Sequence, residues 1–177
     1  MGRSGTFAAL SFLLLTRATL GVAQAGDSSL TVFLHRVGPV VFGMTVSQAT
    51  VALHDPTGYG ASIPDPRCAS FRSNKMPEHV SFMVVGDTIV GLIVDRASVR
   101  TASGAGIGDT EDHLRALYGR HIQIRPHPRW PHGHYLVYLP SDSADRRFTI
   151  IFETDGAHVL SFRAGLRGVV DSIDECP

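Results

Sequence analysis

The chain has 177 residues, 44% of them hydrophobic, with 16 basic and 16 acidic side chains and a formal net charge of zero. A balanced charge gives no electrostatic reason to expect a nucleic acid or an anionic membrane as partner. The length is that of one ordinary domain.

Residues 1–25 have the pattern of a secretory signal peptide. Arg3 precedes the apolar run Phe7–Leu15, and Ala23-Gln24-Ala25 fits a small-x-small cleavage site. The run is shorter than the ~18 apolar residues that a spanning helix needs, and no later segment reaches that length. Because no cysteine lies near the cleavage site, no lipid anchor is expected. We therefore expect a secreted or periplasmic protein that begins at Gly26 and has no membrane span.

The two cysteines are Cys68 and Cys176. In an exported chain an even number of cysteines favours a disulfide bond. Their spacing contains none of the C-x-x-C pairs that are typical of zinc sites. We expect a bridge that joins the C-terminal end to the first half of the chain.

Two similar helix starts organise the sequence. The stretch Gly104–Gly119 (GAGIGDTEDHLRALYG) carries Thr110 as a candidate N-cap, and Val40–Leu53 (VVFGMTVSQATVAL) carries Thr45, 65 positions earlier. Thr45 and Gln48 also form a capping box. This correspondence suggests two similar half-units, either from a duplication or from two ordinary helix starts.

The second helix is expected to be amphipathic. Leu114, Leu117 and Tyr118 share one face at i, i+3 and i+4 spacing, which predicts that all three are buried. Glu111 and Arg115 have the i, i+4 spacing of an ion pair on the outward side.

Apolar, β-rich runs and turn residues predict the strands. Gly86-Asp87 and Asp155-Gly156 are hairpin turns, and Asp55–Pro66 is expected to be a loop. The fold class predicted is α+β, with half-units at about 30–96 and 97–177 that each place a short helix on antiparallel strands. The expected strands are Leu30–Leu34, Val80–Val85, Thr88–Val94, Ser98–Ala102, His121–Arg125, Tyr135–Leu139, Arg147–Phe152 and His158–Arg163.

A histidine-rich loop is the candidate metal site. His127, His132 and His134 carry imidazole side chains, which are suitable ligands for zinc or copper. His132 and His134 are two residues apart, so on a strand both rings would project to one side. No acidic residue within the loop stands at ligand spacing, and a solvated or packed loop explains the same residues. Metal binding therefore stays the alternative, as a metal carrier or a metal-dependent enzyme.

No enzyme signature emerges, so neither a catalytic residue nor a cofactor is predicted. Glu153 is explained by an outward strand position and Asp155 by its turn. Ser81 and Ser161 lack the G-x-S-x-G context of a nucleophile. The glycines in 104–108 lack a phosphate-binding lysine, so they indicate a turn.

An aromatic stretch is the candidate surface for a protein partner. It contains Trp130, His132, His134, Tyr135 and Tyr138. Tryptophan and tyrosine are enriched among the residues that dominate binding energy at protein interfaces. Tyr135 and Tyr138 should face opposite sides of one strand, so the two cannot line the same face.

The helix starts GMTVSQATVAL and GDTEDHLRALYG resemble the G-M-T-x-x-[EQ]-[AV] start of the repeat in the β-lactamase-inhibitor-protein-like superfamily. The chain also resembles uncharacterised exported bacterial proteins of similar length. The superfamily resemblance implies a non-enzymatic, protein-binding module of the cell envelope or medium. The match covers about a dozen residues per half, and the chain lacks the lipid-anchoring cysteine of the superfamily's assembly lipoproteins. A third hypothesis is an envelope protein whose fold serves only its own stability.

Replacing one cysteine tests the predicted bridge. Cys176→Ser should lower the melting temperature by several degrees, because the disulfide would close a loop of roughly a hundred residues and restrict the unfolded chain. The measurement is thermal unfolding of both proteins under non-reducing conditions. An unchanged melting temperature would count against the bridge.

Overall fold

The computed structural model describes residues 1–2, 30–61 and 69–172. Most of the expected signal peptide and both cysteines lie outside this part of the chain. Export and the disulfide bond therefore stay predictions.

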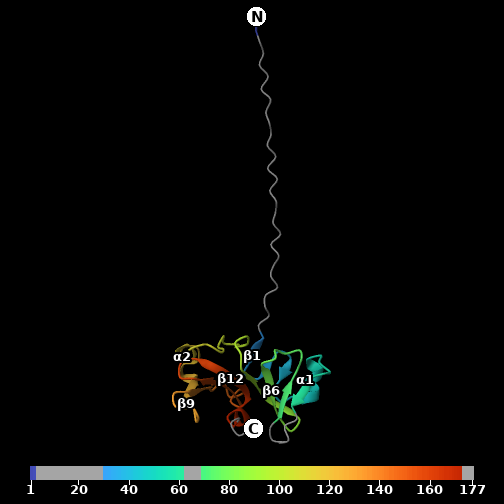
Figure 1. Ribbon diagram of the computed structural model, residues 1–177, viewed down its shortest axis with the longest axis vertical. Coiled ribbons are helices and arrows are strands. Elements are labelled where there is room, and N and C mark those ends of the chain that lie inside the picture. The colour runs from blue at the N-terminus through green and yellow to red at the C-terminus, as the bar shows by residue number, and fades with distance from the viewer. Residues whose placement is uncertain (3–29, 62–68, 173–177) are drawn as a thin grey trace.

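Two β-sheets and a few short helices make up an α+β fold, as the sequence predicts (Figure 1). The large sheet has eight antiparallel strands. Its strands in spatial order are β4 (Tyr59–Ala61), β5 (Ala69–Arg72), β6 (Val80–Val85), β7 (Thr88–Val94), β12 (Val159–Leu166), β11 (Phe148–Thr154), β10 (His134–Tyr138) and β9 (Ile122–Pro126). Those of the small sheet are β3 (Val40–Val41), β2 (Arg36–Val37), β1 (Thr31–Phe33) and β8 (Arg100–Thr101).

The helices are short. They are α1 (Val46–Ala52), α2 (Glu111–Tyr118), the 3₁₀ turn η1 (Gly119–His121) and α3 (Arg167–Val170). Within the described ranges, no helix is long and apolar enough to cross a membrane. Figure 1 shows α1 and α2 on opposite sides of the molecule, with β1 between them.

Both predicted N-caps are confirmed. The Thr45 hydroxyl accepts a hydrogen bond from the Gln48 amide (3.1 Å), and the Gln48 side chain accepts one from the Thr45 amide (2.9 Å). The Thr110 hydroxyl accepts from the His113 amide at 3.1 Å. These bonds satisfy donors that a helix start leaves open.

The strand order reflects two similar half-units. Helix α1 is followed by β4 to β7, and α2 is followed by β9 to β12. Each set of four strands runs from an outer edge of the large sheet to its middle, where β7 pairs with β12. The halves thus meet through their last strands.

Hydrogen bonds at the two helix starts are equivalent. The amides of Gly43 and Gly108, both at positive φ, donate to the carbonyls of Ile89 (2.7 Å) and Val159 (2.9 Å). The return bonds are equivalent too: the Ile89 amide donates to the Met44 carbonyl (2.8 Å), and the Val159 amide donates to the Asp109 carbonyl (2.9 Å). Each helix start is therefore fixed to the final hairpin of its own half.

The final hairpins also share their irregularities. The β6–β7 hairpin has its register shift at Met83–Val84 and the β11–β12 hairpin at Glu153–Thr154. Their turns contain Gly86 and Gly156, which both have positive φ. A common backbone plan thus extends from the helix start through the hairpin.

The main core lies between the large sheet and the layer formed by α1, α2 and the small sheet. Its largest fully buried side chains include Phe82, Phe152, Phe162, Leu92 and Leu136. Burying each such side chain contributes about 1.5–3 kcal/mol to folding. These residues come from β6, β7, β10, β11 and β12, so both halves share one core.

The other face of the large sheet is covered in the middle by α3. Gly91 on β7 lies opposite Gly165 on β12, and a Cβ at these positions would lie 3.0 and 3.1 Å from a methyl carbon of Val170. The two glycines therefore leave the space in which Val170 packs. Met83, Val90 and neighbouring side chains complete this smaller cluster.

Several sequence predictions were wrong in detail. Leu117 is 39% exposed and does not belong to the core. The Arg115–Glu111 pair is present at 2.9 Å, but Glu111 is buried (5% exposed) and not on the outward side. The region Asp55–Pro66, expected to be a loop, contains β4, and β2, β3, β5 and α3 were not predicted.

A buried carboxylate joins the segment after α1 to the loop after β5. Asp55 accepts hydrogen bonds from the Ser73 hydroxyl (2.5 Å) and the Asn74 amide (2.7 Å), and from the Thr57 amide and hydroxyl (3.2 and 2.9 Å). These bonds, that of Ser73 above all, hold the pKa of Asp55 below its ordinary value. The charged form of Asp55 therefore stabilises the folded state.

Stability should consequently decrease in acid. The contribution of Asp55 is complete above the ordinary aspartate pKa of about 4 and is lost as the pH falls toward the lowered folded value. Asp55→Asn should be less stable at pH 7 and lose less stability on acidification, as measured by denaturant unfolding at several pH values. In Asp87→Asn, which removes an exposed charge from the β6–β7 turn, the wild-type pH dependence should persist. An Asp55→Asn variant with the full wild-type pH dependence would refute this role.

Candidate functional site

The loop of residues 126–133, which runs from the last residue of β9 to the start of β10, is closed by its own backbone. The His127 amide donates to the Gly133 carbonyl (2.9 Å), and the Gly133 amide donates to the Trp130 carbonyl (3.0 Å). A Cβ on Gly133 would lie 2.8 Å from the Thr154 carbonyl oxygen, so only glycine fits here. The loop is thereby held against the end of β11.

His127 is the buried centre of this loop. Its Nδ1 atom accepts from the amides of Arg129 and Trp130, both at 3.1 Å. Because Nδ1 is an acceptor, Nε2 carries the proton and donates to the Glu153 carboxylate at 2.9 Å. Both ring nitrogens are therefore occupied, which fixes the tautomer and the orientation of the ring.

Glu153 connects this histidine to Ser161 on β12. Its second carboxylate oxygen accepts from the Ser161 hydroxyl at 2.9 Å. In a nucleophilic triad the histidine stands between the serine and the acid, where it removes the serine proton. Here the carboxylate stands between them, and the distal histidine nitrogen is used by the backbone. The network is therefore built to hold the loop and not to activate Ser161.

Aromatic packing completes the loop. The rings of His127 and Trp130 stack, with centroids 4.5 Å apart and planes 11° apart. Below them the Tyr135 ring lies 4.7 Å from His127 and carries the Arg163 guanidinium at 4.9 Å. Trp130 is nevertheless 41% exposed. The chain's single tryptophan is thus presented to solvent on a fixed support.

A second histidine–carboxylate network lies on the opposite face of the sheet, at the start of α2. Glu111 accepts from Thr154 (2.6 Å), and the same oxygen bonds His134 Nδ1 (2.7 Å). Its other oxygen pairs with Arg115 at 2.9 Å. These partners compensate the burial of the carboxylate charge. The network attaches α2 to the ends of β10 and β11.

The structure does not bring the three candidate metal ligands together. His127 and His134 lie on opposite faces of the sheet in separate networks, and His132 is exposed. Among the described residues, no group of three histidine, cysteine or acidic side chains is placed to hold a metal ion. Metal binding by His127 would require one of its ring nitrogens to give up its present bonds, either to Glu153 or to the amides of Arg129 and Trp130.

The five predicted partner-binding residues divide in a similar way. Trp130 and His132 lie on the exposed loop, and Tyr135 is buried beneath it. Half-buried His134 and Tyr138 lie on the side of α2, where Tyr138 contacts Tyr118. The expectation that Tyr135 and Tyr138 face opposite sides is confirmed.

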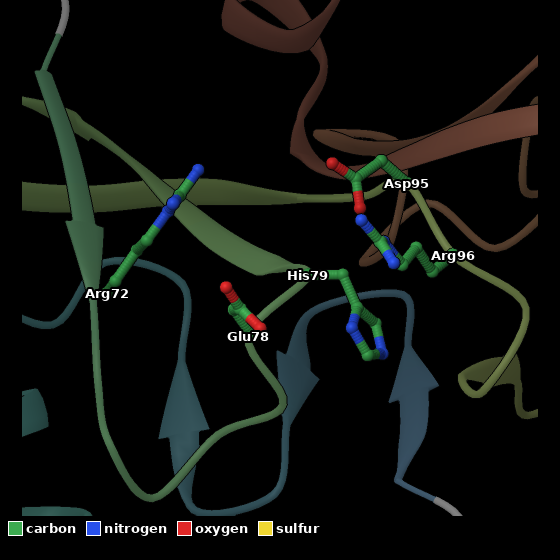
Figure 2. Close-up of a pocket in the computed structure, with 5 residues that line it drawn as sticks. All are labelled: Arg72, Glu78, His79, Asp95 and Arg96. Atoms are coloured by element: carbon green, nitrogen blue, oxygen red, sulfur yellow. The ribbon is translucent and has the colours of Figure 1, made fainter.

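A charged hollow of about 140 Å³ lies at the ends of β5 and β7, away from the loop. Figure 2 shows Arg72, Glu78, Asp95 and Arg96 directed toward a common space, while the His79 ring turns away. The His79 ring contacts the Ser98 hydroxyl. The hollow holds two cations and two anions, so its net charge selects neither sign.

The residues that organise both networks were not predicted from the sequence. Glu111 and Glu153 were assigned to outward positions, and Ser161 was considered only as a nucleophile. The partners of Glu153 lie 26 and 8 positions away, and Thr154 lies 43 positions from Glu111. The turn role of Asp155 is confirmed, since its carboxylate accepts from the amides of Ala157 and His158, which lower its pKa.

Comparison with protein-family models and with curated proteins gives no match. Among solved structures, the chain is similar to the uncharacterized protein yfeY from Escherichia coli. The TM-score is 0.49 at 14% sequence identity, over 77% of this chain and 99% of that chain. A similarity at this level carries no argument about function.

Removing the Glu153 carboxylate tests the support of the loop. Glu153→Ala should cost about 1–3 kcal/mol, because the buried His127 Nε2–H loses its acceptor. Glu153→Gln, which retains an acceptor oxygen, should stay closer to the wild type. Acrylamide quenching of Trp130 fluorescence should increase in the alanine variant as the loop becomes mobile. Equal quenching in all three proteins would show that Glu153 does not order the loop.

Proposed function

We propose that this protein is an exported module that binds another protein through the loop of residues 126–133. The supporting observation is the state of Trp130, which is 41% exposed although its ring is stacked on buried His127. A rigid exposed aromatic side chain loses little conformational entropy on binding. Trp130 is the anchor of the proposed interface, and His132 lies beside it on the exposed loop.

The arrangement of the networks supports recognition rather than catalysis. His127, Glu153 and Ser161 use their polar atoms on one another and on the backbone. These bonds hold the 126–133 loop in place at the surface. The partner's chemistry follows from the anchor: a protein surface with an apolar pocket for an indole ring and polar groups around it. The proposal of export rests on the signal-peptide pattern of residues 1–25. Mass spectrometry of the purified protein tests it, because cleavage of the signal peptide would give a chain that begins at Gly26.

A matched pair of variants tests the interface. Purified wild type, Trp130→Ala and Leu117→Ala are immobilised and incubated with envelope and medium fractions of the producing cells. Leu117 is the control, since it is 39% exposed but lies on α2. A partner retained by wild type and Leu117→Ala should be reduced about tenfold or more by Trp130→Ala, as expected of a central aromatic anchor. Equal retention of the same partners by all three proteins would exclude Trp130 as the anchor.

A further inference from the structure

A cavity of about 240 Å³ lies where the small sheet meets α2 and the large sheet, remote from the 126–133 loop. It is lined by both half-units: residues 32–35 from the first, and residues 101–103, Tyr118, Tyr138, Asp145 and Ile150 from the second. In Figure 1 this region is found between the labels β1 and α2.

Two tyrosine rings form the fixed wall of this cavity. Tyr118 and Tyr138 have ring centroids 4.7 Å apart and planes inclined by 41°. The Tyr118 hydroxyl lies 3.1 Å from the Thr101 hydroxyl, which accepts in turn from the Ala105 amide at 3.1 Å. The Tyr118 ring is thus held in place before any ligand arrives. Burial raises the pKa of Tyr118, so the phenol remains neutral and its ring keeps the quadrupole of an uncharged tyrosine.

The charge of the lining is negative when His35 is neutral. Asp145 is the single carboxylate among the described lining residues, and they include no lysine or arginine. The Asp145 side chain is half-buried, and it makes no hydrogen bond or ion pair within the described part of the chain. A half-buried carboxylate beside an aromatic wall favours a positively charged occupant.

Among the described residues no arginine forms an ion pair with Asp145, and this includes its exposed neighbour Arg146. The Arg36 guanidinium lies over the Phe33 ring at 4.0 Å and donates to the Gly38 carbonyl at 3.1 Å. The Arg147 guanidinium lies over the Phe148 ring at 4.8 Å. Both cations are held on other rings, and neither lines the cavity.

We propose that this cavity binds a small organic cation with an alkylated ammonium group, held by the faces of Tyr118 and Tyr138 and by the Asp145 carboxylate. Aromatic rings combined with a carboxylate recognise such groups because the ring quadrupole attracts a weakly hydrated cation. The apolar side chains of Val32 and Ile150 receive the alkyl carbons. Drug-sized ligands occupy roughly 300–1,000 Å³, so the cavity suits a molecule no larger than choline or a short alkylamine.

Choline and its uncharged isostere 3,3-dimethylbutanol are the probes, because they match in shape and differ in charge. Binding to the full-length protein is measured by isothermal titration calorimetry and by NMR shifts of the tyrosine rings. Choline should bind saturably, with an affinity near the millimolar range, and the neutral isostere about tenfold more weakly. Equal affinity for both probes, or no saturation by ~20 mM choline, would overturn the proposal.

Matched variants separate specific binding from a general charge effect. Asp145→Asn and Tyr138→Leu should each weaken choline binding about tenfold, whereas Tyr138→Phe, which retains the ring, should not. Asp87→Asn removes the same charge from a distant turn and should bind normally. Unchanged binding by Asp145→Asn and Tyr138→Leu would refute the site. Trp130→Ala should also bind choline normally, so this site and the proposed protein interface can fail independently.

Discussion

The pairing of β7 with β12 is the contact on which the rest of the structure depends. Within residues 30–61 and 69–172 it joins the last strands of the two half-units into one sheet whose edge strands are β4 and β9. The pairing is tight around Gly91 and Gly165, where an added Cβ would lie 2.6 and 2.4 Å from backbone carbonyl oxygens. Val170 of α3 occupies the space above them. The shared core and the covered second face require this junction, whereas each helix start is fixed to the hairpin of its own half.

Local chemistry made much of the fold predictable. The hydroxyls of Thr45 and Thr110 and the two glycine-containing turns act within a few residues, so the sequence alone located both helix starts and both final hairpins. Strands β6 and β7 match the predicted bounds because each is a run of six or seven mostly apolar residues next to a glycine-containing turn. Strands of two or three residues, such as β2 and β4, have no such pattern, because only their pairing with neighbours defines them.

The site was less predictable because its contacts connect distant positions. The sequence marked the residues of the 126–133 loop as a candidate partner surface, with metal binding as the alternative. It could not decide between the two roles, because histidine spacing says nothing about which side of a sheet each ring faces. Spatial partners decide the role instead. Glu153 orders His127, and Glu111 orders His134 from the opposite face. The cavity beside Tyr118 depends on even more distant segments, because residues 32–35 meet Asp145 only in the folded protein.

The different side chains at the two helix starts affect which helix can dock on which hairpin. Val46 begins α1 and Glu111 begins α2 at equivalent positions, while Val84 and Thr154 are equivalent in the hairpins. Backbone hydrogen bonds alone would permit either helix on either hairpin. On the first hairpin, however, the Glu111 carboxylate would be buried against Val84 and would lose the Thr154 hydroxyl that donates to it, which is strongly unfavourable. The buried carboxylate thus disfavours exchange of the helices between half-units as the chain folds.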